Sequence, residues 1–292
     1  MKKTNKYKNI LLLYKNSTYA SYFLSDRRRL AQLQGLFNSQ ELKRFRKTHE
    51  NHFWALSYVE AVLKHRKVKF TKICRGTAFN YGLYDLIITV GGDGTFLEAA
   101  RHLTNQVIWG VNSDPTWSVG RFCSGDPRNF ESMLDQVVQG KAQVRKLNRL
   151  SLSFDDGTQP MNVLNDLLIC HQNPGALSRY YLTVGRIKEE QKSSGIWIST
   201  AAGSSGGIHS AGGKVLPQES RNIQYRPREL YRGHGIKYRL NGAVLKSNQK
   251  VTMLSLMREG VVFVDGSHVC LPFSFGSSIH AGSSPHPLKV II

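Results

Sequence analysis

The chain has 292 residues, of which 40% are hydrophobic, so it can bury one large core or two modest ones and is not a disordered chain. Its 40 Lys and Arg against 20 Asp and Glu give a formal net charge of +20, which attracts nucleic acid, anionic membranes or nucleotide-like polyanions. No stretch approaches the roughly 20 apolar residues of a membrane span, and the apolar run after Met1-Lys2-Lys3 is too short for a secretion signal. We therefore expect a cytoplasmic protein.

The first half of the chain alternates between strand-like and helix-like segments. Short apolar or alternating runs at residues 9–14, 68–73, 84–90 and 107–112 are typical of strands. Apolar residues at helical spacing lie between these runs, namely Leu30, Leu33, Leu36 and Phe37, then Phe53, Leu56, Val59, Val62 and Leu63, and finally residues 96–103. Up to about residue 140 this alternation predicts a doubly wound parallel α/β sheet, in which ligands bind at the carboxyl ends of strands.

The strand predicted at residues 84–90 runs directly into Gly91-Gly92-Asp93-Gly94-Thr95. Three glycines let backbone N–H groups approach an anion, and the helix that follows adds the positive end of its dipole. Asp93 is unexpected in a phosphate site because a carboxylate repels phosphate. We interpret it as a proton acceptor, or electrostatic partner, for a hydroxyl brought up to that phosphate. The polar turn at residues 112–114 is predicted to lie at the same edge of the sheet.

From about residue 147 to residue 275 the chain has short alternating runs separated by Gly, Pro and Asn turns, which predicts a β-rich second domain. The clearest runs are residues 150–154, 180–184, 196–199 and 261–264. Asn165-Asp166 follows a further strand-like run at residues 161–164. An amide beside a carboxylate can read ribose hydroxyls or an adenine edge, although such a pair also serves as a turn or cap.

A second unusual segment, residues 195–213, is dominated by Gly, Ser and Ala after a strand-like start, and a short helix is predicted near its end. Small side chains let a flat ligand lie against the backbone, and Ser and Thr hydroxyls can bond a ribose or a phosphate. The alternative is a flexible Gly/Ser loop without a ligand.

Cysteines and histidines give no metal or redox signature. The four cysteines are Cys74, Cys123, Cys170 and Cys270. They are far apart with no CxxC pair, so we expect reduced, mostly buried thiols. His171, His209 and His268 show no metal-ligand spacing, and no metal site is expected.

Taken together, these segments resemble the NAD kinase family over most of the chain. The matching motifs are Gly91 to Thr95, Asn165-Asp166 where the family has Asn-Glu, and residues 194–213. The first motif also occurs in diacylglycerol and sphingosine kinases, so the order and spacing of all three carry the resemblance. Residues 110–115 and 192–195 look most like the branch that contains the mitochondrial NAD kinases of animals.

The resemblance implies an α/β domain over residues 1–145, to which residues 276–292 return, and a β-rich NAD-binding domain over residues 146–275, with the active site between them. It implies transfer of the γ-phosphoryl group of ATP, with Mg²⁺ carried by the ATP, to the 2′-hydroxyl of the adenosine ribose of NAD, giving NADP. Phosphoryl transfer asks a protein mainly for positioning and charge neutralisation. Family members are homodimers or larger homo-oligomers.

The resemblance also implies roles for particular residues. Asp93 would be the catalytic residue that accepts the proton of the 2′-hydroxyl. The phosphate-binding residues would be Gly91, Gly92, Gly94 and Thr95. The NAD-binding residues would be Asp93, Gly94, Asn165, Asp166, Lys192, Ser194, Ser205, Gly206 and Ser210.

Three positions depart from the family pattern. Lys192 and Ser194 stand where relatives often have Arg and Asp, and Gly207 stands where many have Tyr. These departures leave room for NADH as the acceptor. The choice between ATP and polyphosphate as the donor stays open.

Two other classes of function compete with this interpretation. A lipid kinase would use the same glycine turn with an apolar acceptor pocket and a basic membrane-docking surface. A non-catalytic nucleotide- or nucleic-acid-binding protein would explain the charge of +20 and would bind with steep salt dependence. The chain has no basic motif interleaved with aromatic residues, so no specific nucleic-acid partner is expected.

Overall fold

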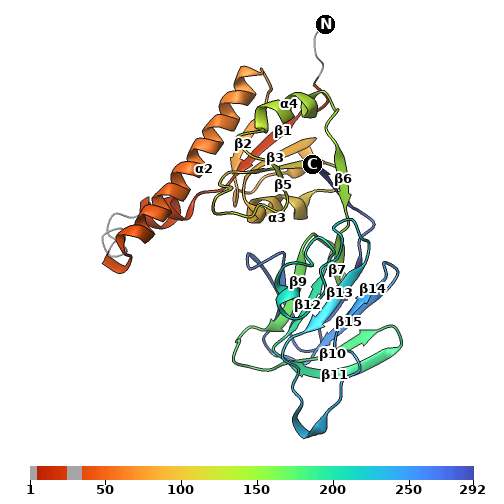
Figure 1. The fold of residues 1–292 in the computed structure, drawn as a ribbon. Coiled ribbons are helices and arrows are strands. Elements are labelled where there is room, and N and C mark those ends of the chain that lie inside the picture. Colours follow the sequence, from red (N-terminus) through yellow and green to blue (C-terminus); the bar gives the residue numbers. More distant parts are fainter. Residues whose placement is uncertain (1–4, 25–34) are drawn as a thin grey trace. The chain divides into compact units, whose positions relative to one another are not determined.

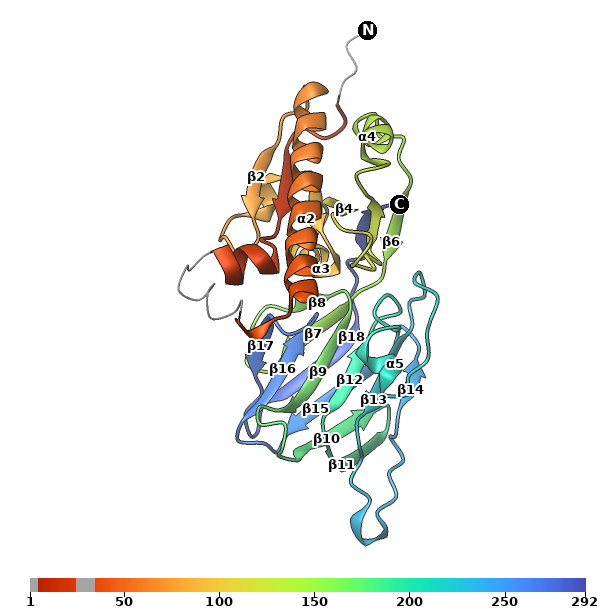
Figure 2. The same cartoon turned by 60° about the vertical axis from the view of Figure 1, so that its left-hand side comes forward.

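A computed structural model describes residues 5–24 and 35–292 of the chain. Two of the residues at predicted helical spacing, Leu30 and Leu33, lie outside the described residues. The chain divides into two compact units, which we call unit 1 (Met1–Arg145 and Lys289–Ile292) and unit 2 (Lys146–Leu288). Figures 1 and 2 show the elements of both units.

Unit 1 is built on a single sheet. Its strands are β1 (Ile10–Tyr14), β2 (Thr71–Cys74), β3 (Leu86–Gly91), β4 (Val107–Asn112), β5 (Cys123–Gly125), β6 (Val144–Leu147) and β19 (Leu288–Ile291). Its helical segments are the π-helical turn η1 (Ala20–Leu24), α2 (Ser39–His65), the 3-10 turn η2 (Tyr81–Leu83), α3 (Asp93–His102) and α4 (Phe130–Val138).

The sheet of unit 1 has the order β2-β1-β3-β4-β19-β6, with β5 beside β4. β1 pairs in parallel with both β2 and β3, and β4 pairs in parallel with β3 and β19. This confirms the predicted doubly wound parallel α/β fold. From β1 the chain adds β2 on one side of the sheet, and β3 and β4 are then added on the other side. The topological switch point therefore lies between β1 and β3. Open α/β sheets bind their ligands at such a point.

The two faces of this sheet bury different helices. Alternate strand residues such as Leu12, Ile88 and Trp109 share one core with the buried residues of α2 and α4. α3 packs along β3, β1 and β4 with its own buried side chains, Phe96 among them. Because both faces are covered, every residue of β3 is buried, and this explains its uninterrupted apolar sequence.

Helix α2 begins after a capping box. Asn38 Oδ1 accepts hydrogen bonds from the backbone N–H groups of Gln40 and Glu41, and Glu41 Oε2 accepts one from Asn38 N. The expected apolar face is buried from Leu56 onward, but Phe53 is 63% exposed. The prediction was wrong there because Phe53 points away from the sheet, where its ring lies beside that of His49 one helical turn earlier.

Unit 2 contains the remaining strands. They are β7 (Leu150–Phe154), β8 (Met161–Val163), β9 (Asp166–His171), β10 (Ser178–Val184), β11 (Ile187–Ser193), β12 (Ile196–Ser199), β13 (Ile223–Pro227), β14 (Ala243–Leu245), β15 (Lys250–Ser255), β16 (Gly260–Val264), β17 (Val269–Pro272) and β18 (Ser278–Ser283). The short helix α5 (Gly207–Ser210) follows β12, and the 3-10 turn η3 (Gly233–Gly235) follows β13.

These strands form two antiparallel six-stranded sheets (Figure 2), β11-β10-β15-β18-β7-β8 and β14-β13-β12-β9-β16-β17. Buried apolar residues of both sheets form one common core. The β-rich second domain is therefore confirmed. The return to unit 1 begins at Lys289 and not at residue 276, because β18 pairs with β15 and β7 inside unit 2.

The cysteines are less buried than expected. All four are free thiols; Cys270 is exposed, and Cys74, Cys123 and Cys170 are partly buried. Each lies in or at the end of a strand. Among the described helices, none combines the length and the hydropathy needed to cross a membrane.

Candidate functional site

The glycine turn forms the start of α3. Gly92 is the N-cap residue and Asp93 the first residue of the helix, which therefore starts earlier than the predicted residue 96. The backbone N–H of Thr95 donates to the carbonyl of Gly92 at 3.0 Å and closes the first turn. A carboxylate in this position lies at the positive end of the helix dipole, which stabilises its charge.

The Asp93 carboxylate is held by the loop that follows β4. Its Oδ1 accepts a hydrogen bond from Phe122 N at 2.9 Å, and its Oδ2 accepts one from Arg121 N at 3.1 Å. An ionised carboxylate offers about four acceptor sites, so the group is oriented and keeps acceptor capacity for a further donor. Burial, with the Asp93 charge adding to it, raises the pKa of Cys123 to about 12, so the neighbouring thiol stays protonated.

Close packing explains two of the glycines. A β-carbon on Gly91 would lie 2.4 Å from Thr95 Oγ1, and one on Gly92 would lie 2.6 Å from Ser118 Oγ. Thr95 is only 1% exposed, and its hydroxyl makes no hydrogen bond with the residues that the structure describes. The structure therefore places the Thr95 hydroxyl beneath the turn, while Gly94 lies on its exposed side.

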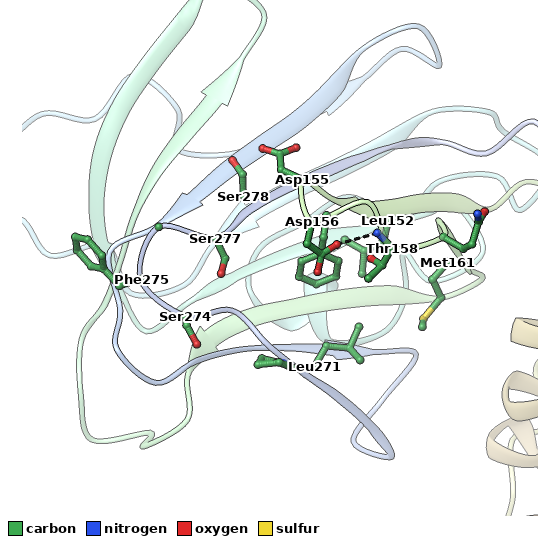
Figure 3. Close-up of a pocket in the computed structure, with 14 residues that line it drawn as sticks. Leu152, Asp155, Asp156, Thr158, Met161, Leu271, Ser274, Phe275, Ser277 and Ser278 are labelled. Atoms are coloured by element: carbon green, nitrogen blue, oxygen red, sulfur yellow. Dashed lines mark hydrogen bonds between the residues drawn. The ribbon is translucent and has the colours of Figure 1, made fainter.

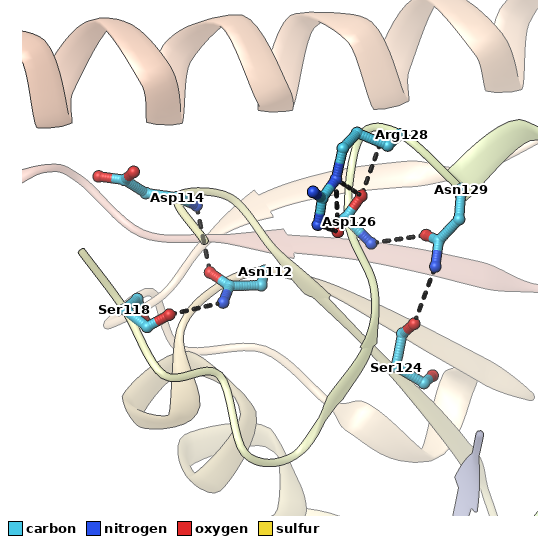
Figure 4. Close-up of polar contacts among 7 residues, drawn as sticks. All are labelled: Asn112, Asp114, Ser118, Ser124, Asp126, Arg128 and Asn129. Atoms are coloured by element: carbon cyan, nitrogen blue, oxygen red, sulfur yellow. Dashed lines mark hydrogen bonds and ion pairs between the residues drawn. The ribbon is translucent and has the colours of Figure 1, made fainter. Parts of the chain in front are cut away.

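The polar turn after β4 lies at the same edge, because β3 and β4 pair with Gly91 opposite Asn112. Asn112 accepts a hydrogen bond from Asp114 N at 3.1 Å and donates one to the carbonyl of Ser118 at 2.9 Å (Figure 4). Asn51 of α2 donates to Asp114 Oδ1 at 3.0 Å. The loop whose backbone N–H groups bind the Asp93 carboxylate is thus held in place at its start, directly after β4.

Two basic residues at this edge had not been predicted. Lys15 directly follows β1, and Arg75 directly follows β2. Their side chains lie against Gly91 and Gly94. Both could have been found from the sequence, because each is a basic residue just after a predicted strand. The carboxyl ends of parallel strands lie at one edge of the sheet, where ligands bind.

In unit 2, Asn165 lies between β8 and β9, and Asp166 is the first residue of β9. Asp265 accepts hydrogen bonds from Asn165 N at 2.6 Å and from Leu164 N at 3.2 Å. Asn165 Nδ2 donates to Asp166 Oδ2 at 3.2 Å. Asp166 is 4% exposed, and burial, with the nearby Asp265 carboxylate adding to it, raises the pKa of Asp166 to about 7.

The Gly/Ser segment packs directly against this pair. Thr200 N donates to the carbonyl of Asn165 at 3.1 Å, and a β-carbon on Gly203 would lie 2.1 Å from that same oxygen. A β-carbon on Gly206 would lie 3.4 Å from Asp166 Oδ2. The segment is therefore an ordered part of the Asn165-Asp166 site and not a flexible linker.

The other predicted NAD-binding residues are more widely spread. Ser205 is next to Gly206, and Ser210 is exposed at the end of α5. Lys192 lies in β11, and Ser194 precedes Gly195, which packs against Cys170. Asp166 is the first residue of β9 and Cys170 is four residues further along the same strand. A rise of about 3.3 Å per residue puts the two residues about 13 Å apart. The structure brings Ser205 and Gly206 to the Asn165-Asp166 pair and leaves Lys192 and Ser194 at the other end of β9.

A separate pocket of about 770 Å³ in unit 2 contains none of these residues (Figure 3). Its wall includes Phe154, Met161 and Leu271, with Asp156 accepting a hydrogen bond from Thr158 N at 2.9 Å. Within the described residues there is no group of three or more His, Cys, Asp or Glu side chains that could hold a metal ion. Of the histidines singled out in the sequence, His209 lies 3.1 Å from the carbonyl oxygen of Gly213 through its Nδ1.

Comparison with known proteins identifies the family. Residues 34–142 match the model of the ATP-NAD kinase N-terminal domain. A protein of Oryza sativa named probable NADH kinase is 31% identical over 264 residues, which cover 82% of this chain and 81% of the relative. The chain belongs to the NAD kinase family.

Further members of the NAD kinase family agree in sequence and in fold. The NADH kinase of Arabidopsis thaliana is 31% identical over 277 residues, covering 84% of each chain. The crystal structure of an NAD kinase from Archaeoglobus fulgidus in complex with ATP superimposes with a TM-score of 0.69 over 97% of this chain and 93% of that one, at 22% identity. Yeast NADH kinase complexed with NADH gives a TM-score of 0.67 over 97% of this chain and 83% of its own, at 14% identity.

Proposed function

We propose that the chain is a dinucleotide kinase that transfers the γ-phosphoryl group of ATP to the 2′-hydroxyl of the adenosine ribose of NAD or NADH. The single observation that best supports this is the Asp93 carboxylate, oriented by two backbone N–H groups at the first turn of α3. Family membership supports the choice of substrates. The rice relative is named probable NADH kinase and the Arabidopsis relative NADH kinase, which favours NADH as well as NAD among the acceptors.

In this mechanism the 2′-oxygen attacks the γ-phosphorus, and Asp93 takes the hydroxyl proton. The bond from the γ-phosphorus to the β–γ bridging oxygen breaks, and ADP leaves with that electron pair. Apart from that of Thr95, the N–H groups of the first turn of α3 are not used by the hydrogen-bond pattern of the helix and can face the donor's phosphates. Gly91 and Gly92 keep the turn free of side chains, and Thr95 shapes it from below.

The acceptor site is proposed in unit 2. Asn165 keeps one amide N–H and its carbonyl oxygen for ribose or base contacts, and Asp166 can accept from a ribose hydroxyl once it is ionised. Ser205, Gly206 and Ser210 would line the pocket, and Lys192 with Ser194 would contact a more distant part of the dinucleotide. Mg²⁺ would arrive with ATP, bound mainly by phosphate oxygens.

The deciding assay incubates the purified full chain with MgATP and, in separate reactions, NAD, NADH, a sphingoid base and diacylglycerol. We expect NADP or NADPH and no phosphorylated lipid, with the ratio of kcat/KM values ranking the two dinucleotides. Replacing ATP by polyphosphate tests the donor. Product from a lipid alone, or steeply salt-dependent nucleic-acid binding without any product, would reject the proposal. Light scattering tests the homodimer or larger oligomer, and fractionation of the source cells tests the cytoplasmic location; both stay predictions.

A further inference from the structure

Three neighbouring strands of unit 1 end side by side at the glycine turn. Tyr14, the last residue of β1, pairs with Cys74 of β2 and with Val90 of β3. The next residues of β1 and β2 are Lys15 and Arg75, and Arg75 N donates to the carbonyl of Tyr14 at 2.7 Å. Two cationic side chains therefore leave the sheet beside the turn, at its topological switch point.

Both side chains lie close to the glycines. Lys15 Cγ is 3.6 Å from the position that a β-carbon on Gly91 would take, and Arg75 Nη1 is 3.4 Å from the corresponding position on Gly94. The lysine stem thus covers the first glycine and the guanidinium covers the third. The two basic side chains therefore flank the glycine turn at the start of α3.

The electrostatics of this pair favour an anion. Burial lowers the pKa of Lys15, the positive charge of Arg75 lowers it further, and the Asp114 carboxylate opposes both effects. Arg75 Nε is held 3.2 Å from Glu98 Oε2, which fixes its direction without removing its repulsion of Lys15. An anion between two like charges relieves that repulsion and gains charge-assisted hydrogen bonds from both groups.

The position of Lys15 is fixed by α2 and the loop after β4. His52 Nε2 lies 2.8 Å from the carbonyl oxygen of Lys15, and His52 Nδ1 lies 2.8 Å from Ser113 Oγ. Burial is the main cause that lowers the pKa of His52, so the ring is neutral at physiological pH. Nε2 then donates to the carbonyl and Nδ1 accepts from the serine, which ties the end of β1 to two other elements.

We infer that Lys15 and Arg75 are the cationic ligands of the donor's phosphate groups, with Lys15 against the first glycine of the turn and Arg75 against the third. The inference rests on the proposed function for the identity of the donor, a nucleoside triphosphate. The guanidinium supplies a planar fork that can hold two phosphate oxygens, and the ammonium acts as a compact point charge. His52 holds the backbone of Lys15 at the end of β1.

The test measures binding of MgATP and of inorganic tripolyphosphate to the full chain by calorimetry, without an acceptor. Lys15→Met and Arg75→Met should each weaken both ligands by roughly 10-fold or more, the scale of a hydrogen bond to a charged group. Lys69→Met removes the same charge from an exposed position just before β2 and is the matched control, expected to bind like the wild type. In steady-state assays the two variants should raise KM for ATP while KM for NAD or NADH stays within about two-fold.

A second measurement uses the unmodified protein, so that it does not depend on the folding of a variant. Saturating MgATP should protect Lys15, but not Lys69, from reductive methylation read by mass spectrometry. Equal labelling of Lys15 with and without MgATP, or tripolyphosphate binding by Lys15→Met equal to that of Lys69→Met, would overturn the inference. The binding and labelling measurements need no acceptor. If the wild type is inactive with NAD and NADH but MgATP still protects Lys15 from methylation, the proposed function is rejected and the phosphate site is retained.

Discussion

The indole ring of Trp197 occupies the space beside the α-carbon of Gly207. A β-carbon on Gly207 would lie 2.6 Å from Trp197 Cζ2 and 2.9 Å from Cη2. Gly207 opens α5, and Trp197 lies in β12. The family pattern has a tyrosine at residue 207 in many members, and here an aromatic ring from the neighbouring strand takes up that space.

Gly207→Tyr should lower the free energy of unfolding by about 1–3 kcal/mol, because the tyrosine and Trp197 compete for one volume. Trp197→Ala removes the obstacle. In denaturant titrations of the wild type, both single variants and the double variant, we expect the double variant to be more stable than the sum of the single effects predicts. Strict additivity would show that the two positions do not compete.

Asp93→Asn should lower kcat by roughly 10²-fold or more, since the proton acceptor for the 2′-hydroxyl is lost. It should also cost about 1–3 kcal/mol of stability, because an amide group cannot accept well from both Phe122 N and Arg121 N. Steady-state kinetics and thermal unfolding measure the two effects separately.

Asp85→Asn is the control for Asp93→Asn. Asp85 Oδ2 accepts hydrogen bonds from Lys8 N and Asn9 N, each at 3.0 Å, just before β3 begins. This variant makes the same change of carboxylate to amide at another group that accepts two backbone N–H bonds, far from the turn, and should keep the wild-type kcat. A wild-type turnover for Asp93→Asn would remove Asp93 from the reaction, and a similar loss in Asp85→Asn would assign the effect to structure.

Asp166 should make stability depend on pH. Its pKa is about 7 in the folded protein and 3.8 without perturbation, so the folded state binds more protons between these values. The stabilisation from this preferential protonation of folded Asp166 is fully present below about pH 4 and is lost as the pH rises through 7. It amounts to a free energy of unfolding on the order of a few kcal/mol. The wild type should therefore lose stability relative to Asp166→Asn between pH 5 and pH 8. A constant difference between their unfolding free energies over this range would contradict the assignment.

Gly203→Ala should destabilise unit 2 by about 1–3 kcal/mol or more, because the new methyl group would meet the backbone oxygen of Asn165. Backbone cannot swing aside as a flexible side chain does. Gly175→Ala is the matched control, since its nearest neighbour is Asn173 Oδ1 at 3.3 Å, in an exposed turn. Equal melting temperatures of the two variants would contradict the prediction and would mean that the backbone from Thr200 to Gly206 can shift to accommodate the methyl group.

The strand-turn-helix around Gly91 was predictable because every signal in it is local. An apolar run, a glycine turn and a helix former follow one another within about a dozen residues, and each obeys a rule of sequence. The face of α2 was predicted less well. The helical spacing of apolar residues placed Phe53 on the same face as Leu56. Spacing alone does not show at which residue the buried part of that face begins, because this depends on where the helix packs on the sheet.

The partners of the site residues could not be predicted. Asp265 is 100 residues from Asn165 in sequence, and only the pairing of β9 with β16 brings it there. The hydrogen bonds to Asp93 come from a loop nearly 30 residues later. Lys15 and Arg75 become neighbours because β1 pairs with β2, a property of strand order that composition and periodicity do not contain.

The place of β19 in the first sheet has a consequence for biosynthesis. β19 lies between β4 and β6 and pairs with β4, yet the ribosome makes it after all of unit 2. While unit 2 is being translated, the nascent α/β unit has an unfilled place beside β4, and exposed strand edges of this kind recruit other chains. Completion of the first sheet therefore waits for a strand that is made after all of unit 2, and a chaperone that covers the edge of β4 until then would protect the growing polypeptide.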